Sequence, residues 1–177
     1  MASLNPGQNY DHLLTVVSGY DGMHDLMFHG APEAAADFRR GAIVSLNTAG
    51  EFVAGLDSLV SLALWAVNDV VDFDAASDTG NISGGVVTTY PATGGYELKT
   101  TEVELTTSVA GDYTPNTLLT ASGAGVDLGK VTPVTLAGGG EAPLDTNICG
   151  VVSKGVSTDV YGQQVLNFWP VYLPARA

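Results

Sequence analysis

Residues 39–55 read RRGAIVSLNTAGEFVAG, and this stretch decides the class of fold. Residues 42–47 alternate with the two-residue period of a β-strand, and residues 51–54 extend again. Between them, Gly50 can adopt a positive φ without steric cost, and the Asn47 side chain can bond its own backbone. The stretch therefore predicts a β-hairpin whose turn is encoded locally.

The composition of the whole chain agrees with a β protein. Its 177 residues include 22 Gly and 8 Pro, with many Val and Thr, which is typical of strands joined by frequent turns. A length of this size fits one core. We predict an all-β fold, a small β-barrel or β-sandwich spanning residues 38–177, preceded by an extended N-terminal arm of residues 1–37.

The charge pattern restricts the partners. Nineteen Asp and Glu against six Lys and Arg give a formal net charge of −13, and no Lys or Arg occurs between Gly41 and Leu98. A protein that binds nucleic acid needs clustered basic residues, so we expect no nucleic-acid partner. The longest apolar run, residues 59–67, is too short to cross a bilayer, and the N-terminus lacks the pattern of a signal peptide. We expect no membrane partner and synthesis in the cytoplasm.

Further strands are predicted along the chain. Residues 59–67 are apolar on both faces, as in a central strand, and residues 86–90 and 96–105 flank a Pro-Gly turn at 91–95 that predicts a second hairpin. The change of apolar parity near Thr100 predicts a bulge or bend there. Residues 118–121 and 129–134 form a third predicted pair.

The C-terminal third predicts three strands at 148–152, 156–161 and 165–173, with turns at 153–155 and 162–164. Because Pro170 cannot donate a ladder hydrogen bond, the last strand should end or lie at a sheet edge there. Both tryptophans lie in apolar runs and are expected to pack in the core rather than stack on a ligand. The predicted core comprises Val44, Leu62, Leu64, Leu98, Leu119, Val151, Phe168 and Val171, with Trp65 and Trp169.

No set of residues indicates catalysis, a cofactor or a metal. The single cysteine, Cys149, lies in an apolar run and is expected to be a small buried hydrophobic residue. The acidic segment with Asp69, Asp72, Asp74 and Asp78 lacks the spacing and closing Glu of a calcium loop. The histidines His12, His24 and His29 lack the usual spacing of zinc ligands. We expect no catalytic residue, no cofactor and no metal.

The arm contains one short apolar segment. Residues 13–17 are apolar on both parities, and the polar, Gly-containing sequence around them cannot build a core. We expect this segment to dock on a neighbouring subunit of a homo-oligomer, with a trimer favoured and a dimer possible. The predicted interface residues are Leu13, Leu14, Val16 and Val17.

Several segments together resemble the head decoration, or capsid cement, proteins of tailed bacteriophages. They cover most of residues 37–174 and comprise residues 39–46, 64–68, 92–102, 113–120 and 150–174. The resemblance implies a virion structural protein, a small β-barrel or sandwich that binds the outside of the assembled capsid, contacts the major capsid protein and cements neighbouring capsomers. It implies no catalytic residue.

Two other classes of function remain open on the sequence. A tail or fibre module that binds a host receptor would be favoured by a sugar-sized pocket lined with exposed aromatic side chains. A cytoplasmic β-rich enzyme acting on a small molecule would be favoured by paired acids in a pocket that titrate abnormally.

Overall fold

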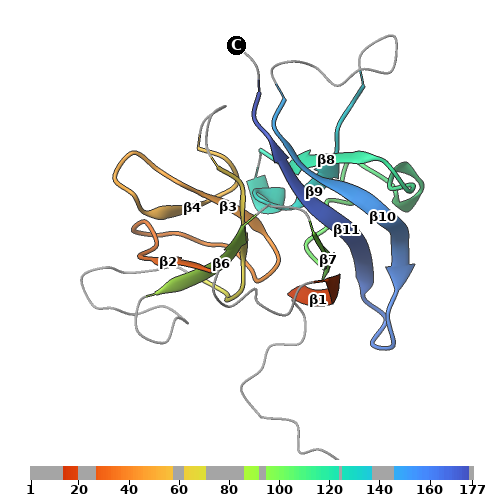
Figure 1. Cartoon of the computed structure of the whole chain (residues 1–177), viewed down its shortest axis with the longest axis horizontal. Helices are drawn as coiled ribbons and strands as arrows, with labels where there is room; N and C mark the ends of the chain where they lie inside the picture. The colour runs from red at the N-terminus through yellow and green to blue at the C-terminus, as the bar shows by residue number, and fades with distance from the viewer. Residues whose placement is uncertain are drawn as a thin grey trace, which may run out of the picture.

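The computed structural model describes residues 14–19, 27–57, 62–70, 86–91, 95–123, 125–136 and 146–175. In these residues the chain forms two antiparallel sheets, a larger and a smaller one, that lie beside each other (Figure 1). Helical structure is limited there to two short 3-10 turns, η3 (Ala110–Asp112) and η4 (Gly125–Asp127). The all-β prediction is confirmed, as a sandwich-like pair of sheets rather than a closed barrel.

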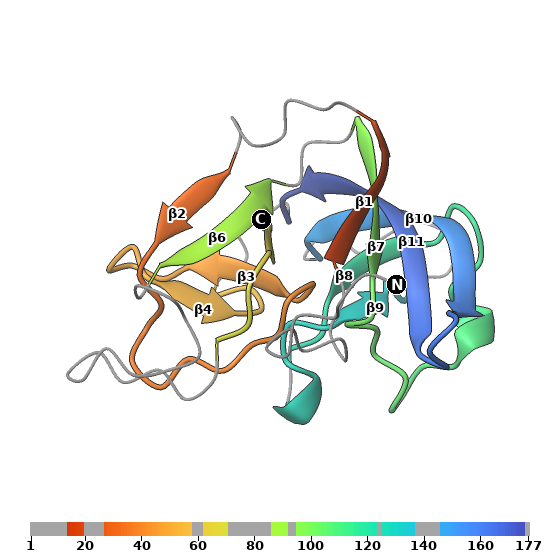
Figure 2. The ribbon, with the colours of Figure 1, turned by 90° about the horizontal axis from the view of Figure 1, so that it is seen from below.

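The larger sheet has the strand order β1-β7-β11-β10-β8-β9. Its strands are β1 (Leu14–Gly19), β7 (Tyr96–Thr100), β8 (Leu118–Ala121), β9 (Val131–Pro133), β10 (Ile148–Thr158) and β11 (Gln164–Leu173). The smaller sheet has the order β2-β6-β5-β3-β4. Its strands are β2 (Phe28–Gly30), β3 (Ile43–Leu46), β4 (Phe52–Ala54), β5 (Leu64–Ala66) and β6 (Val87–Pro91). Figure 2 shows the two groups of strands from a second side.

The first predicted hairpin forms as expected. Strands β3 and β4 pair antiparallel, with Val44 opposite Ala54. The Asn47 side-chain oxygen accepts hydrogen bonds from the backbone N–H groups of Ala49 and Glu51, both at 2.9 Å. Gly50 has a φ of 82°, the left-handed conformation that glycine adopts freely. Local chemistry therefore sets this turn.

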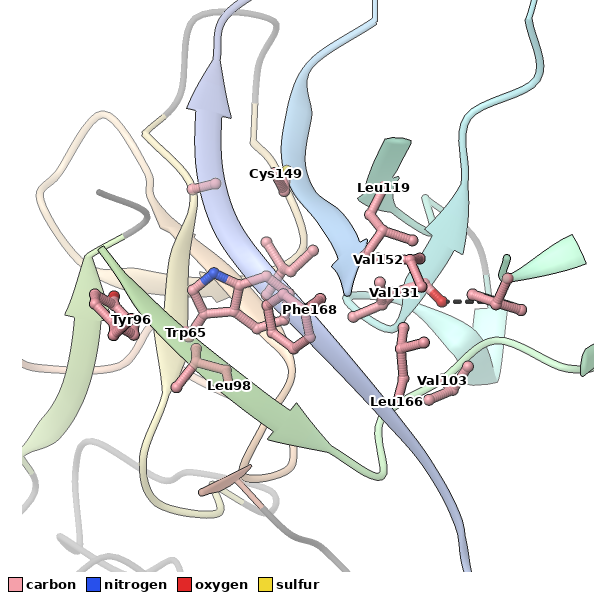
Figure 3. Close-up of a cluster of buried hydrophobic side chains, with 13 residues drawn as sticks. Trp65, Tyr96, Leu98, Val103, Leu119, Val131, Cys149, Val152, Leu166 and Phe168 are labelled. Atoms are coloured by element: carbon pink, nitrogen blue, oxygen red, sulfur yellow. Dashed lines mark hydrogen bonds between the residues drawn. The ribbon is translucent and has the colours of Figure 1, made fainter. Parts of the chain in front are cut away.

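The inner faces of the two sheets share one core (Figure 3). Trp65 from β5 and Phe168 from β11 stack at a centroid distance of 4.4 Å, and both are fully buried. The Thr100 hydroxyl on β7 donates to the Gly41 carbonyl at 3.1 Å and adds a polar link between the sheets. Burying each large apolar side chain contributes about 1.5–3 kcal/mol, so this core is the main attachment of one sheet to the other.

A close backbone approach joins the sheets at a second point. The Ile43 N–H on β3 donates to the Gly129 carbonyl at 2.7 Å, just before β9. Gly129 has a φ of 79°, and a Cβ there would lie 2.7 Å from the Ile43 carbonyl oxygen. Only glycine fits this junction without displacing backbone.

The smaller sheet carries a second core on its outer face. Val44, Leu64 and Ala66 alternate with the inward-facing Ile43 and Trp65, and they belong to a separate buried cluster. The chain before β3 covers this face, because Phe38 is 3% exposed and forms a β-bridge with Val70. The buried members of this cluster are Ala36, Phe38, Ala42, Val44, Phe52, Leu64, Ala66, Val70 and Val87.

The prediction that residues 86–90 and 96–105 form a second hairpin is wrong. Strand β6 pairs with β2 and β5, whereas β7 pairs with β1 and β11. The two strands therefore belong to different sheets and do not form a hairpin. The bend at Thr101 that follows β7 is confirmed, as is the pairing of β8 with β9.

The C-terminal strands differ from the prediction at one turn. β10 runs without a break through residues 153–155, where the register with β11 shifts as in β-bulges. The turn predicted at 162–164 forms slightly earlier, at residues 159–163, and β11 already begins at Gln164. β11 does not end at Pro170, because it continues to Leu173, but at Pro170 it lies at a local edge of the described sheet, as predicted. Its pairing with the neighbouring β7 spans only Leu166–Phe168, so Pro170 need not donate on that side.

Most of the predicted core residues are buried. Val44, Leu64, Trp65, Leu98, Leu119 and Phe168 are each fully buried. The prediction for Leu62 is wrong: its side chain is 43% exposed, because the residue precedes β5. Val151 and Val171 are only half-buried. The prediction that Trp169 packs in the core is also wrong. Its side chain is 40% exposed, because consecutive residues of a strand face opposite sides and Phe168 faces the core.

The described parts of the predicted arm belong to the sheets of this chain. β1 pairs with β7 along the edge of the larger sheet, and β2 pairs with β6 along the edge of the smaller one. Leu14 and Val16 pack partly buried against the shared core. The premise that this segment finds no surface within its own chain is therefore wrong for residues 14–17, because strand β7 supplies one, whereas docking on a neighbouring subunit stays a prediction.

Candidate functional site

The buried carboxyl groups are the first place to look for chemistry. Glu104 is 2% exposed and follows the bend after β7. Its carboxylate accepts hydrogen bonds from the backbone N–H groups of Thr106 and Thr107, both at 2.6 Å, and from the Ser108 hydroxyl at 2.8 Å. Burial raises the pKa of this carboxyl, but the hydrogen bonds from Thr107, Ser108 and Thr106 outweigh burial and lower the pKa to about 2. Glu104 stays ionised and fixes the loop that follows it.

A second buried carboxylate lies on the outer face of the larger sheet. Glu97 on β7 accepts hydrogen bonds from Ser153, from the Asn167 amide at 3.2 Å and from Ser18 at 3.4 Å. Burial raises its pKa, and these hydrogen bonds together with the charge of Lys154 outweigh burial and lower it. The carboxylate ties β1, β7, β10 and β11 together across the sheet.

Asp127 and Cys149 are two further buried groups whose pKa values are shifted. A hydrogen bond from Lys130 at 2.9 Å is the main cause of the lowered pKa of Asp127. Burial raises the pKa of the Cys149 thiol to about 12, so the thiol is protonated at neutral pH and is a poor nucleophile. The expectation that Cys149 is a buried hydrophobic residue is confirmed.

An open groove of about 910 Å³ lies beside the segment that covers the smaller sheet. Four carboxylates and two basic groups contribute to its walls, and Phe38 is its single aromatic residue, which is itself buried. The carboxyl groups with a shifted pKa, Glu97, Glu104 and Asp127, do not line it. The groove is lined by Glu33, Ala35, Ala36, Asp37, Phe38, Arg39, Ala42, Val53, Ala54, Leu56, Asp57, Thr101, Glu102, Gly125, Val126, Leu128 and Lys130.

This groove lacks the features that would favour either open alternative. A sugar-binding pocket would present exposed aromatic side chains, and a general acid would have a raised pKa in the pocket. Each carboxyl group with a shifted pKa in the described residues is shifted downward. Glu97, Glu104 and Asp127 therefore serve as structural acceptors of hydrogen bonds.

Two of the candidate metal ligands, His29 and Asp69, lie in the described residues. His29 lies on the exposed strand β2, where its Nδ1 is 3.1 Å from the Thr88 hydroxyl. Asp69 accepts a hydrogen bond from the Arg40 N–H at 2.7 Å. Within the described ranges, no three His, Cys, Asp or Glu side chains gather where they could hold a metal ion. His12, His24, Asp72, Asp74 and Asp78 lie outside those ranges.

The outer face of the larger sheet carries an apolar row that the sequence reading did not identify. Trp169 on β11 lies opposite Val151 on β10, and Val151 lies opposite Leu118 on β8. The residues next to them, Phe168 and Leu119, point into the shared core, so alternation turns the row outward. Trp169 is 40% exposed, and Val151 and Leu118 are half-buried. We call Trp169, Val151 and Leu118 the outer row.

The outer row continues toward the C-terminal end of β11. Leu173 is 52% exposed and lies opposite Ile148. Val171, which lies between Trp169 and Leu173 on β11, is half-buried. The row and its extension contain no charged side chain, although the chain as a whole has a formal charge of −13. An uncharged apolar row of this kind on a strongly acidic protein is suited to contact with another macromolecule.

Three of the four predicted interface residues, Leu14, Val16 and Val17, lie on β1 at one edge of the larger sheet. Leu14 and Val16 are half-buried on β1, and Val17 is 42% exposed. Leu13 lies just outside the described residues. The described members therefore support β1 within the sheet, and only Val17 presents a largely exposed side chain.

Comparison with known proteins gives no relative: no protein-family profile, no curated protein and no solved structure matches the chain. Among the residues that the structure describes, no helix is long and apolar enough to span a bilayer.

The sequence analysis did not predict the outer row, because it placed Phe168, Trp169 and Val171 of the terminal strand all in the core. A signal for it was present, since Phe168 and Trp169 are neighbours and a strand sends consecutive side chains to opposite faces. Whether Phe168 or Trp169 is the buried residue depends on which face of the strand packs against another segment of the chain. That segment contains Trp65, which is distant in sequence.

Proposed function

We propose that this chain is a virion structural protein that binds the outer surface of an assembled phage capsid, contacts the major capsid protein and stabilises neighbouring capsomers. The resemblance of its segments to head decoration proteins suggests the class. The observation that carries the proposal is the outer row, because an uncharged apolar strip with a half-exposed tryptophan fits a broad protein surface better than a small-molecule site.

The physical argument concerns area and repetition. A specific protein interface buries about 800 Å² on each partner, which is available on a sheet face but not in a narrow pocket. A cement protein that bridges subunits binds several weak surfaces at once, so assembly of the shell raises the effective concentration of each contact. The chain should therefore bind assembled shells far better than free capsid subunits.

The oligomeric state is part of the same proposal. Three copies around a three-fold position of a capsid lattice would present three outer rows to three neighbouring capsid subunits, and closed cyclic symmetry favours such a trimer over an open chain. A dimer is the second possibility. Sedimentation of the purified protein distinguishes the two.

The test is binding to undecorated expanded shells of the phage that carries this sequence. We expect saturable binding to the shells and weak binding to unassembled subunits. Trp169→Ser should reduce shell binding, whereas Phe28→Ser, which changes a residue 47% exposed on the other sheet, should not. Equal affinity of the wild-type protein for shells and free subunits, or no binding to shells, would contradict the proposal.

A further inference from the structure

The end of the β10–β11 hairpin extends beyond the rest of the larger sheet. β8 pairs with β10 at Gly150 and Val151, and β7 pairs with β11 at Leu166–Phe168. Among the described residues, the part of the hairpin between Gly155 and Val165 therefore has no third strand beside it. Figure 1 shows this two-stranded ribbon projecting past the other strands of its sheet.

The turn at the end of the ribbon is held by its own hydrogen bonds. The Asp159 carboxylate accepts from the backbone N–H groups of Tyr161 at 2.8 Å and Gln163 at 2.9 Å. The Asp159 N–H donates to the Gln163 carbonyl at 2.9 Å, and Gly162 has a φ of 84°. These hydrogen bonds favour one conformation of the turn without a partner.

This fixed turn presents two apolar side chains to solvent. Val160 is 92% exposed and Tyr161 is 73% exposed, at a position where turns usually carry small polar residues. The residues on either side of the turn, Ser157, Thr158, Gln163 and Gln164, are uncharged, and the Asp159 carboxylate is the one charge among residues 157–164. An exposed apolar pair on a pre-organised turn costs little conformational entropy when it is buried by a partner.

We propose that the Val160–Tyr161 tip is an anchor that inserts into an apolar pocket on the capsid surface. The inference rests on the proposed function and names a second contact, separate from the outer row. The tip is an aliphatic and an aromatic side chain side by side, so the pocket that fits it is apolar with a hydrogen-bond acceptor or donor near the Tyr161 hydroxyl.

The small size of the tip identifies the kind of partner. Two side chains expose much less than the roughly 800 Å² per partner that a stable specific interface needs, so two copies of this chain meeting only through their tips would not form a stable dimer. A contact this small is effective as one point of a multivalent attachment. A capsid shell that also binds the outer row provides that situation.

The chain offers a matched control for the test. Val126 in η4 has the same exposure as Val160, 92%, but lies beside the open groove and not on the ribbon. Val160→Ser and Val126→Ser make the same chemical change at equal exposure. Neither residue supports the core, so both variants should keep the thermal melting temperature of the wild-type protein.

The experiment measures the affinity of each protein for undecorated expanded shells. Losing one buried valine side chain corresponds to a fall in affinity of roughly tenfold for Val160→Ser, and Val126→Ser should change affinity by less than about twofold. Asp159→Ala keeps Val160 and Tyr161 but releases the turn, so it should weaken binding by roughly three- to tenfold. Asp159→Ala therefore measures how much the fixed conformation of the turn contributes to affinity, apart from the contact of the two apolar side chains.

The outcomes distinguish this inference from the function beneath it. Wild-type binding with unchanged affinity in Val160→Ser overturns the tip and leaves the capsid-binding proposal in place. Equal losses in Val160→Ser and Val126→Ser also overturn the tip, because the effect is then not specific to the ribbon. A change of sedimentation in Val160→Ser would assign the tip to self-association instead. If the wild-type protein does not bind shells, both proposals fail.

Discussion

The two sheets have similar inner faces and very different outer faces. On the smaller sheet, Val44 and Leu64 point outward and are fully buried, because Phe38 and the segment around it fold over them. On the larger sheet, the outward positions of β10 and β11 hold Val151 and Trp169, and Trp169 keeps 40% of its surface exposed. The same alternation of strands produces a second core in one sheet and an open apolar row in the other.

The difference teaches how to separate stability from recognition in this protein. An apolar residue on a covered face removes its surface from water in the folded monomer and so stabilises the fold. An apolar residue on an uncovered face contributes that free energy only when a partner covers it. Substitutions on the two faces should therefore affect different measurements.

The largest effect is expected on the covered face. Leu64→Ala removes a fully buried side chain from the outer core of the smaller sheet and leaves a cavity. We expect a loss of about 3 kcal/mol in the free energy of unfolding. Chemical denaturation monitored by tryptophan fluorescence measures it, and a loss below about 1 kcal/mol would mean that the covering segment does not exclude water from this face.

An intermediate effect is expected from Glu97, the buried acid on the outer face of the larger sheet. Glu97→Gln removes the charge that strengthens its hydrogen bonds to Ser153, Asn167 and Ser18, with an expected cost of about 1 kcal/mol at pH 7. Because the folded protein has a lowered pKa at this carboxyl, the stabilisation is present above the pKa of the unfolded chain.

The same variant has a defined pH dependence. As pH falls below the ordinary range of a glutamate and through the lowered pKa of the folded state, Glu97 becomes protonated and its stabilisation is lost. The stability difference between wild type and Glu97→Gln should therefore shrink toward zero in acid. A difference that stays constant from pH 7 to pH 3 would show that the carboxylate charge contributes nothing.

A small effect on stability is expected on the open face. Trp169→Ala should lower the free energy of unfolding by less than about 1 kcal/mol, because much of the ring is exposed in the folded protein. Phe168→Ala, one residue earlier and fully buried, is the control and should cost about 3–5 kcal/mol. Similar losses for the two variants would contradict the assignment of Trp169 to the outer face.

The smallest effect is expected in the covering segment itself. Ala35 has a φ of 62°, a left-handed conformation that is unfavourable for residues with a Cβ. Ala35→Gly should relieve this strain and raise the free energy of unfolding by about 0.5 kcal/mol. Differential denaturation against the wild type tests it, and a destabilised variant would show that the Ala35 methyl group contributes packing that outweighs the strain.

The sequence alone was sufficient for features that depend on neighbours in the chain. The turn at Asn47 and Gly50 was predictable because a side-chain oxygen and a glycine specify it within five residues. The burial of Cys149 and Trp65 followed from the apolar runs around them.

The sequence was insufficient where two distant segments compete for the same neighbour. The Pro-Gly link at 91–95 suits a hairpin, but β6 already has β2 and β5 on its two sides, so β7 joins the other sheet. The apolar segment at 14–17 looked unpartnered because its partner, β7, lies about eighty residues away in the chain. Pairing of this kind depends on which strand edges remain free.

What the sequence by itself determined is the all-β class, the local turns and the alternation of side chains along each strand, because these follow from backbone sterics and from hydrogen bonds within a few residues. What only the tertiary structure decided is which face of each strand is covered. Phe38 buries the outer face of the smaller sheet, and Trp65 buries Phe168 while leaving Trp169 outside. Coverage depends on contacts between segments far apart in the chain, and local alternation specifies two faces without specifying which one is buried.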